Sequence, residues 1–227
     1  MRLAILFTGG KDSLYAMYKV MKEHKNVVCL LTMFSKNKES YMFHTSSIEI
    51  TKLQAKTLNL PLLIGKTDGE KETELKDLKN LIQEAVKKYK IDGIVTGALY
   101  SVYQSERIAN ICKGLGLKCI NPLWHLEPEE ELNELLKNKF EFILTAVAAD
   151  GLDKSWLNKI ITKIDIKKLK ELNKKYGVSL IGEGGCFESL VLNCPIFNKK
   201  ISILDYEIKM ESENTGKLVI KKATLSD

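Results

Sequence analysis

A glycine-rich stretch near the N-terminus has the residue types and the order of an anion-binding site. It runs from Thr8 to Ser13 and reads Thr-Gly-Gly-Lys-Asp-Ser. Glycines let backbone N–H groups approach a phosphate, because no Cβ stands in the way. Lys11 adds a mobile positive charge, and the hydroxyls at both ends can donate hydrogen bonds. The stretch is therefore a candidate phosphate site.

The residues on either side predict the elements that would position this stretch. The apolar run 3–7 is typical of a short buried strand, and the apolar residues after Ser13 recur at helical spacing (Leu14, Met17, Tyr18 and Met21). A glycine turn between a strand and a helix start adds unpaired N–H groups and the positive end of the helix dipole. A turn capped by Asp12 that binds nothing is the alternative, and this context favours binding.

The residue order excludes one common nucleotide motif and matches another. A Walker A loop needs glycine and Ser or Thr where this chain has Ile5 and Asp12. The stretch resembles instead the SGGKDS signature of the PP-loop ATP pyrophosphatases, which split ATP between the α- and β-phosphates. The resemblance implies that Asp12 holds the loop or a magnesium ion. It also implies which residues bind phosphate: Thr8, Gly9, Gly10, Lys11 and Ser13.

A second polar stretch, 97–107, follows another predicted strand. Its small pair Gly97-Ala98 leaves room for a ligand. Three polar residues then recur at every third position, on one side of a helix start: Ser101, Gln104 and Arg107. An arginine there could hold a phosphate or a carboxylate with two parallel hydrogen bonds. An ordinary helix start with a surface arginine explains the spacing equally well, so both interpretations stay open.

A third stretch, 182–189, combines three glycines with two acids, Glu183 and Glu188. These carboxylates could bind a cation, position a magnesium ion or hold a base. Phe187 could offer an aromatic face to a quaternary ammonium group. A tight turn into a strand at 190–192 is the simpler explanation, and the glycines alone favour it.

The elements around these stretches predict an α/β fold. Strand patterns at 3–7, 27–33, 62–64, 93–96 and 118–120 alternate with helical patterns at 14–22, 48–58, 75–89 and 103–114. This alternation is typical of a doubly wound parallel sheet, whose ligands bind beyond the carboxyl ends of the strands. The first two stretches follow such strand ends.

The pattern changes after Pro122. Helices are predicted at 129–136, 156–161 and 166–176, and strands at 142–147, 201–210 and 218–222, the last two joined by a turn at 214–216. We predict a nucleotide-binding domain over residues 1–122. A second, smaller mixed α/β domain over residues 123–227 would close over the nucleotide site.

The composition is that of an ordinary globular protein, with 44% hydrophobic and 28% charged residues and a net charge of +6. This charge permits an acidic partner without identifying one. No apolar run reaches the roughly 18 residues of a membrane helix. The five cysteines form no C-x-x-C pair and no export signal precedes them, so we expect a reduced cytoplasmic protein. We expect neither a membrane nor a nucleic-acid partner, and a homo-oligomer stays open.

The three stretches, in this order, resemble the diphthine–ammonia ligase family. The second reads G-A-x-x-S-x-Y-Q-x-x-R and the third G-E-G-G-x-F-E-[ST], which is specific to this family. Shorter stretches at 40–45, 121–124 and 193–195 match as well, so the likeness to the short archaeal-type members covers nearly the whole chain. Cys186 departs from the pattern, because the family commonly has an acid there.

The resemblance implies a reaction. Diphthine is a modified histidine of translation elongation factor 2 that carries a carboxylate and a trimethylammonium group. The family converts that carboxylate to an amide with ATP and ammonium, giving diphthamide, AMP and pyrophosphate. An acyl-adenylate supplies the leaving group that a carboxylate lacks, and magnesium neutralises phosphate charge.

The resemblance also implies roles for residues of this chain. The backbone around Thr32 and the pair Gly97-Ala98 would flank the adenosine, and His44 would lie at the rim of the site. The α-phosphate or the substrate carboxylate would face Ser101, Gln104 and Arg107. The substrate pocket would be lined by Glu183 and Glu188. We therefore predict as catalytic residues Lys11, Asp12, Arg107, Glu183 and Glu188.

Two other functions compete with this interpretation. One is a PP-loop enzyme that adenylates a tRNA base, which the positive net charge slightly favours. Such an enzyme usually has an RNA-binding appendage or paired cysteines, and neither is evident. The other is an ATP-binding sensor without turnover, which would not need the polar residues of the second and third stretches.

Overall fold

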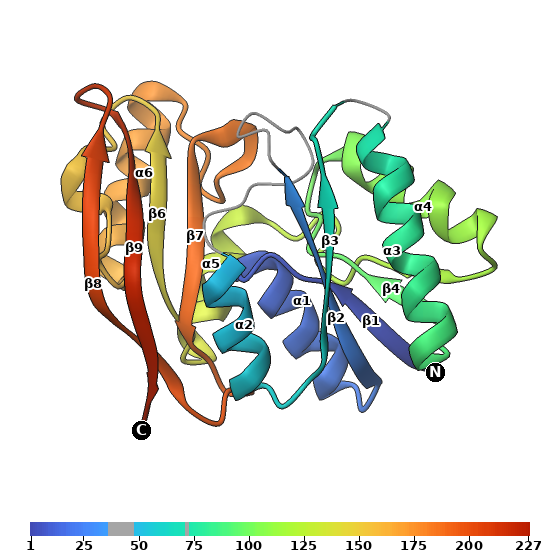
Figure 1. Cartoon of the computed structure of the whole chain (residues 1–227). Helices are drawn as coiled ribbons and strands as arrows, with labels where there is room; N and C mark the ends of the chain where they lie inside the picture. Colours follow the sequence, from blue (N-terminus) through green and yellow to red (C-terminus); the bar gives the residue numbers. More distant parts are fainter. Residues whose placement is uncertain (36–47, 71–72) are drawn as a thin grey trace. The chain divides into compact units, whose positions relative to one another are not determined.

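The computed structural model describes residues 1–35, 48–70 and 73–227, so the predicted rim residue His44 and the stretch 40–45 lie outside the described residues. The chain divides into two compact units, Met1–His125 and Leu126–Asp227 (Figure 1). The boundary predicted from the sequence lies three residues earlier, after Pro122.

The first unit is built on a five-stranded parallel sheet in the order β3-β2-β1-β4-β5 (Figure 1). Its strands are β1 (Arg2–Leu6), β2 (Asn26–Ser35), β3 (Leu62–Thr67), β4 (Gly93–Val95) and β5 (Lys118–Ile120). Its helices are α1 (Lys11–Lys22), α2 (Ile48–Thr57), α3 (Thr73–Tyr89) and α4 (Val102–Gly114). The predicted α/β fold with a parallel sheet is confirmed.

The helices cover both faces of this sheet. The helices α3 and α4 bury Leu78, Ile82 and Ile108 against strand residues that include Ala4 and Ile94. The helices α1 and α2 lie on the other side (Figure 1). Two helices on each face are what a doubly wound sheet requires, because each face of a parallel sheet must be shielded from water.

The order of the strands reverses between β1 and β4. The chain moves outward from β1 through β2 to β3, then crosses back to β4, which pairs with the free side of β1 from Leu3 opposite Gly93 to Ile5 opposite Val95. The carboxyl ends of β1 and β4 therefore lie side by side. Such a reversal is where open α/β sheets bind ligands. The turns that carry the first and second stretches both begin there.

The second unit has a four-stranded antiparallel sheet in the order β7-β6-β9-β8. Its strands are β6 (Glu141–Ala148), β7 (Phe187–Asn193), β8 (Lys200–Met210) and β9 (Thr215–Ser226), and its helices are α5 (Pro128–Lys137) and α6 (Lys163–Tyr176). Two short 3-10 turns complete it, η1 (Lys154–Trp156) and η2 (Glu183–Gly185). Thr215 and Gly216, predicted to lie in the β8–β9 turn, belong to β9.

The predicted helix at 156–161 is wrong. Beyond η1 the chain forms two isolated bridges with β6, a parallel one from Leu157 to Leu144 and an antiparallel one from Ile160 to Ile143. Between them Asn158 lies in a turn, with a φ of 54°. The N–H of Ile161 donates to the carbonyl of Phe142 at 2.9 Å. The apolar residues of this segment fit a helix face by spacing alone. Because β9 pairs with β6 only over Ala146–Ala148, the first half of β6 still offers hydrogen-bond partners to the backbone of this segment.

Asp165 at the start of α6 gives a testable pH dependence. Its carboxylate accepts hydrogen bonds from the Thr162 N–H at 3.0 Å, the Thr162 hydroxyl at 2.7 Å and the Lys159 ammonium at 2.5 Å. Burial by itself raises the pKa of the Asp165 carboxyl, but the hydrogen bonds from Lys159 and Thr162 outweigh it and hold the pKa below its usual 3.8.

Asp165→Asn is expected to lower the free energy of unfolding by about 1–3 kcal/mol at pH 7. Because the folded-state pKa is depressed, the carboxylate stabilises the fold above the unfolded-state pKa, and this stabilisation is lost as pH falls through the folded-state value. Urea unfolding from pH 7 to pH 3 checks it, with the exposed Asp205→Asn as control. A difference between wild type and Asp165→Asn that stays constant down to pH 3 contradicts the prediction.

Candidate functional site

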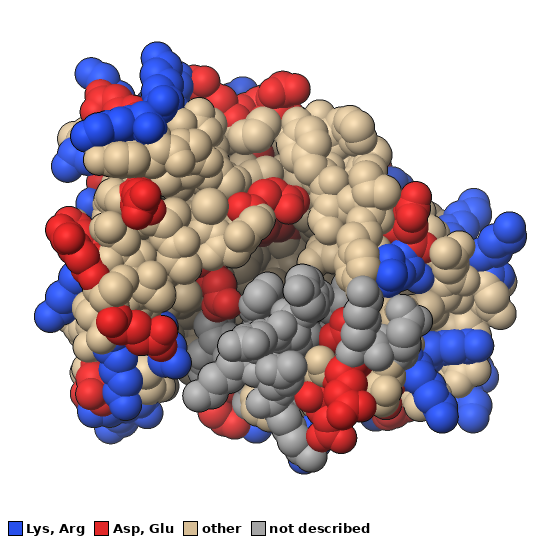
Figure 2. Space-filling view, turned by 90° about the horizontal axis from the view of Figure 1, so that it is seen from above, with Lys and Arg blue, Asp and Glu red and all other residues tan. Residues whose placement is uncertain are grey.

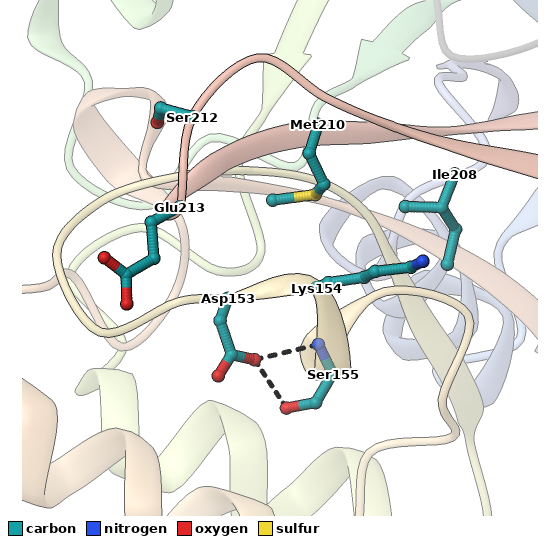
Figure 3. A pocket seen from close by; sticks show the side chains of 7 residues that line it. All are labelled: Asp153, Lys154, Ser155, Ile208, Met210, Ser212 and Glu213. Atoms are coloured by element: carbon teal, nitrogen blue, oxygen red, sulfur yellow. Dashed lines mark hydrogen bonds between the residues drawn. The ribbon is translucent and has the colours of Figure 1, made fainter.

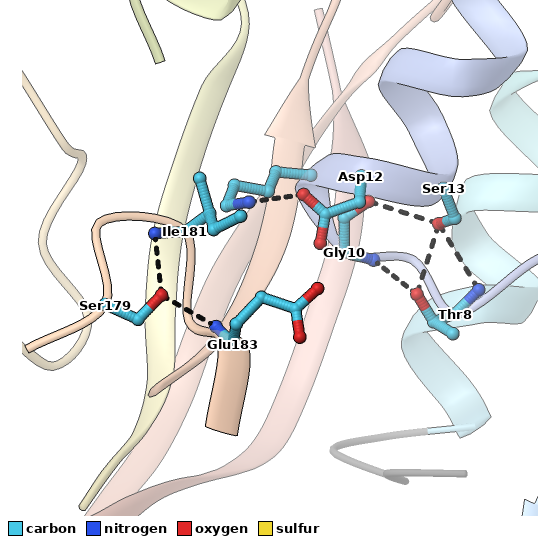
Figure 4. A network of polar contacts seen from close by, with 8 residues as sticks. Thr8, Gly10, Asp12, Ser13, Ser179, Ile181 and Glu183 are labelled. Carbon is cyan, nitrogen blue, oxygen red and sulfur yellow. Dashed lines mark hydrogen bonds and ion pairs between the residues drawn. The ribbon is translucent and has the colours of Figure 1, made fainter. Parts of the chain in front are cut away.

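The turn between β1 and α1 is closed by its own hydroxyl groups (Figure 4). The Ser13 hydroxyl donates to the Gly10 carbonyl at 3.2 Å and accepts from the N–H and the hydroxyl of Thr8 at 3.3 and 3.1 Å. The Thr8 hydroxyl in turn accepts from the Gly10 N–H at 3.3 Å. These bonds fix the backbone of the turn, which reduces the ordering cost when a ligand binds.

Gly9 has a conformation and surroundings that only glycine suits. Its φ is 81°, and an added Cβ would lie 2.2 Å from the side-chain oxygen of Gln54. The Gln54 amide donates to the Gly9 carbonyl at 2.9 Å. Gln54, a fully buried residue of α2, was not among the predicted site residues. The sequence offers one signal for Gln54: it is a polar residue that lies three positions after Thr51, on the same buried face of a helix.

Lys11 and Asp12 form an ion pair at the start of α1. The Lys11 side chain is fully buried, whereas that of Asp12 is 35% exposed. A buried ammonium needs a negative partner, since the desolvation of an unpaired charge is costly. The cap residue is Gly10, which has no side chain that could accept hydrogen bonds from the first N–H groups of the helix. The helix start thus combines a buried cation with backbone N–H groups, an arrangement that suits an anion.

Thr32 ties β2 to the end of β1. Its buried hydroxyl donates to the Phe7 carbonyl at 2.7 Å, directly before the first stretch. The β1–β2 pairing ends with Leu6 opposite Leu31, whereas β2 continues along β3 to Ser35. The predicted adenosine contact at 31–33 therefore falls where β2 extends past the end of β1.

The second stretch packs directly onto the first. An added Cβ on Gly97 would lie 2.7 Å from the carbonyl carbon of Asp12 and 2.8 Å from the nitrogen of Ser13. The backbones of two segments that are 85 positions apart in the sequence thus approach so closely that no side chain fits between them. Ala98, the neighbour of Gly97, is buried, and its N–H donates to the Thr96 hydroxyl at 3.2 Å.

The polar residues of the second stretch lie at the start of α4. Ser101 caps the helix, because its hydroxyl accepts from the N–H of Gln104 at 3.4 Å. The Arg107 guanidinium lies over the Tyr103 ring, with its central carbon 3.4 Å from the ring centroid, and one of its nitrogens donates to the Tyr103 carbonyl at 3.4 Å. Stacking on the ring leaves the planar fork of the arginine held in one orientation.

Asn121 braces this region, although its role was not predicted. Its side chain accepts from the Thr96 hydroxyl at 2.8 Å and donates to the Ser105 hydroxyl at 2.9 Å. The ends of β4 and β5 and the first turn of α4 are thereby joined. One signal was present in the sequence, since Asn121 begins a stretch that matches the resembled family.

The third stretch lies in the second unit. Gly182 has a φ of 84°, and the Ser179 hydroxyl accepts from the N–H groups of Ile181 and Glu183 at 3.3 and 3.0 Å (Figure 4). Glu183 is half-buried in η2, and Glu188 is half-buried in β7 opposite Ala146. The two hydrogen bonds to the Ser179 hydroxyl fix the turn that carries Glu183.

Phe187 differs from its expected role as an aromatic face for a ligand. The side chain is only 6% exposed. An added Cβ on Gly182 would lie 3.0 Å from its ring. The ring is therefore packed against the glycine turn, and its faces are used by the fold.

An open groove of about 700 Å³ lies elsewhere in the second unit, between η1 and the β8–β9 hairpin (Figure 3). It is lined by Asp153, Lys154, Ser155, Ile208, Met210, Ser212 and Glu213. The Asp153 carboxylate is held by the N–H and the hydroxyl of Ser155 at 2.8 and 2.6 Å. All the predicted site residues lie outside this lining.

The charged residues on the face seen in Figure 2 occur in several small basic and acidic groups separated by uncharged residues. This distribution is typical of a solvated surface. No helix in the described parts of the chain is long and apolar enough to cross a bilayer. Among residues 1–35, 48–70 and 73–227, no three His, Cys, Asp or Glu side chains gather closely enough to hold a metal ion by themselves.

Comparison with known families decides between the interpretations. Residues 1–119 match the family model of the diphthamide synthase N-terminal domain, and residues 127–225 match that of the C-terminal domain. The chain belongs to the diphthamide synthase family. The residues between the two matched ranges include the division between the units at His125 and Leu126.

Curated relatives named diphthine–ammonia ligase resemble this family member over most of its length. The Mus musculus protein is 36% identical over 231 residues, which cover 93% of this chain and 86% of the relative. The Homo sapiens protein is 33% identical over 234 residues, with the same coverage of 93% and 86%. A longer Schizosaccharomyces pombe relative is 32% identical over 243 residues, which cover 100% of this chain and 40% of that protein.

Proposed function

We propose that this chain is an ATP-dependent ligase that amidates the carboxylate of diphthine on translation elongation factor 2 with ammonium. One structural observation carries the proposal in a member of the diphthamide synthase family: Gly97 packs onto Asp12 and Ser13. This contact joins a phosphate-type turn to a second polar site at the reversal of the strand order. A reaction between ATP and a carboxylate needs these two sites together.

The first step activates the carboxylate. A carboxylate oxygen attacks the α-phosphorus of ATP, a new P–O bond forms, and the bond to the β-phosphate breaks to release pyrophosphate. The Lys11 ammonium and the N–H groups at the start of α1 stabilise the negative charge that develops on the leaving pyrophosphate. The guanidinium of Arg107, held on the Tyr103 ring, binds the α-phosphate or the substrate carboxylate.

The second step forms the amide. Ammonia attacks the carbonyl carbon of the acyl-adenylate, a C–N bond forms, the bond to AMP breaks, and the nitrogen loses a proton. The glutamates Glu183 and Glu188 hold the ammonium and accept protons. Exclusion of water protects the adenylate from hydrolysis.

A magnesium ion fits the same site. Mg²⁺ is usually bound through one or two carboxylates together with substrate phosphates. Asp12 provides such a carboxylate beside the phosphate turn, with its side chain 35% exposed. The ion supplies positive charge that offsets the phosphates.

The decisive experiment measures AMP formation from ATP and ammonium, with and without diphthine-bearing elongation factor 2, together with the mass of that factor. Substrate-dependent AMP and a loss of about one mass unit, from OH to NH₂, are expected for activated acyl transfer. AMP formation that depends on bulk tRNA would support the tRNA alternative. Binding of ATP without AMP release would support the sensor. Either result would overturn the proposal.

A further inference from the structure

Three aromatic rings gather beyond the ends of β4 and β5, and one of them belongs to the second stretch. The rings of Tyr100 and His125 have centroids 5.6 Å apart and are inclined by 46°. Those of Trp124 and His125 are 4.9 Å apart and inclined by 61°. Tyr100 and His125 are exposed and Trp124 is half-buried. The proposed reaction steps use none of these side chains.

Backbone hydrogen bonds fix this aromatic cluster to the candidate site. The N–H of His125 donates to the carbonyl of Leu99 at 3.0 Å, and the N–H of Trp124 donates to the carbonyl of Asn121 at 3.1 Å. His125 has a φ of 59°, an uncommon conformation for a residue other than glycine. The cluster is therefore held in place by the loops that carry it.

The geometry of the cluster differs from that of an apolar core. Two of its three residues, Tyr100 and His125, are exposed to solvent, whereas the rings of a core are buried. In the described residues, lysine or arginine groups lie over other rings, as Arg107 does over Tyr103, but none lies over the Trp124 ring. Electron-rich faces of this kind attract a cation from outside the fold.

We propose that Tyr100, Trp124 and His125 bind the trimethylammonium group of the diphthine side chain. This inference rests on the proposed function. A quaternary ammonium has no N–H, so hydrogen-bond acceptors cannot select it, whereas aromatic faces attract its diffuse charge. Tyr100 directly precedes Ser101, and three peptide units separate it from Gly97, a span of at most about 11 Å. The cluster therefore places the cation beside the candidate carboxylate site.

The kinetic test compares two forms of elongation factor 2, one with diphthine and one with the unmethylated amine. Tyr100→Ala and Trp124→Ala are each expected to raise KM for the diphthine form roughly 5- to 30-fold, the range for a desolvated cation–aromatic contact. The KM for ATP and the activity on the unmethylated form should stay unchanged. Tyr100→Phe and Trp124→Phe keep a ring and should retain selectivity, as should Tyr206→Ala, which removes an exposed tyrosine of the second unit.

A binding measurement separates this inference from the proposed reaction. In a Trp156→Phe background Trp124 is the remaining tryptophan. Its fluorescence is expected to change saturably with tetramethylammonium or glycine betaine, but not with neutral tert-butanol, and Tyr100→Ala should abolish the change. If wild type amidates diphthine and both alanine variants keep full selectivity, the aromatic site is wrong and the function stands. If wild type does not amidate, the function fails, and the fluorescence titration decides the site by itself.

Discussion

Replacing Lys11 by methionine is expected to lower ATP-dependent AMP formation by roughly 10²- to 10³-fold, the typical cost of removing one preorganised charge-stabilising group. Lys11 is fully buried and paired with Asp12 at the first turn of α1. Methionine fills a similar volume with an unbranched apolar chain, so the packing is kept while the positive charge is lost. Steady-state AMP release at saturating substrate, with ATP affinity measured separately, checks the prediction.

A matched control comes from the same helix. Lys22 is an exposed residue in the last turn of α1, where its ammonium lies 5.8 Å from the centroid of the Tyr18 ring. Lys22→Met removes the same charge far from the phosphate turn and should leave turnover within about twofold, the usual outcome at a surface site. Circular dichroism confirms that both variants are folded. A folded Lys11→Met enzyme with the turnover of Lys22→Met would show that Lys11 does not stabilise the reacting phosphates.

The strands and helices of the first unit could be predicted because local patterns determine them. Short apolar runs and helical spacing give each element, and their alternation leads to a parallel sheet. The strand order could not be read in the same way. It depends on β4 pairing with β1 rather than with β3, and the local pattern of a strand does not say which other strand it pairs with.

The residues of the site were predicted from their types. The roles of some of them depend on contacts between distant segments, which the spacing of residues along the chain does not show. Ser13 was expected to bind phosphate, and the backbone around Thr32 to flank the adenosine. In this structure the Ser13 hydroxyl also holds the backbone of the turn, and the Thr32 hydroxyl holds the end of β1. Gln54 supports Gly9 from a helix distant in sequence. In the sequence, nothing distinguishes a side chain that donates to a carbonyl 45 positions away from any other polar residue on a helix.

The segment 156–161 shows why the second unit was harder to predict. Its apolar spacing fits a helix, but its conformation follows from bridges to the first half of β6, which β9 leaves unpaired. Secondary structure that forms through pairing with a distant strand carries little local signal. The aromatic cluster has the same origin, since Tyr100 and Trp124 come together through the pairing of β4 with β5.

Gly97→Ala is expected to weaken ATP binding and to destabilise the first unit by about 1–3 kcal/mol, the usual cost of overpacking a close contact. The new Cβ would lie 2.7, 2.8 and 2.9 Å from backbone atoms of Asp12 and Ser13. Backbone atoms of a helix start cannot rotate away as a flexible side chain can. The loop after β4 must therefore move away from α1, and a shift of about 1 Å in a catalytic arrangement can lower the rate by 10²-fold.

Gly114→Ala provides the control, because an added Cβ at Gly114, the last residue of α4, meets nothing within 4 Å. The same one-carbon change should there be neutral or stabilising by about 0.5 kcal/mol, as is usual for alanine in a helix. Thermal unfolding gives the stability, and AMP formation well below the unfolding temperature gives the effect on the site. If Gly97→Ala loses stability but keeps the ATP affinity and turnover of Gly114→Ala, then this contact serves the fold, and the two stretches do not act as one nucleotide site.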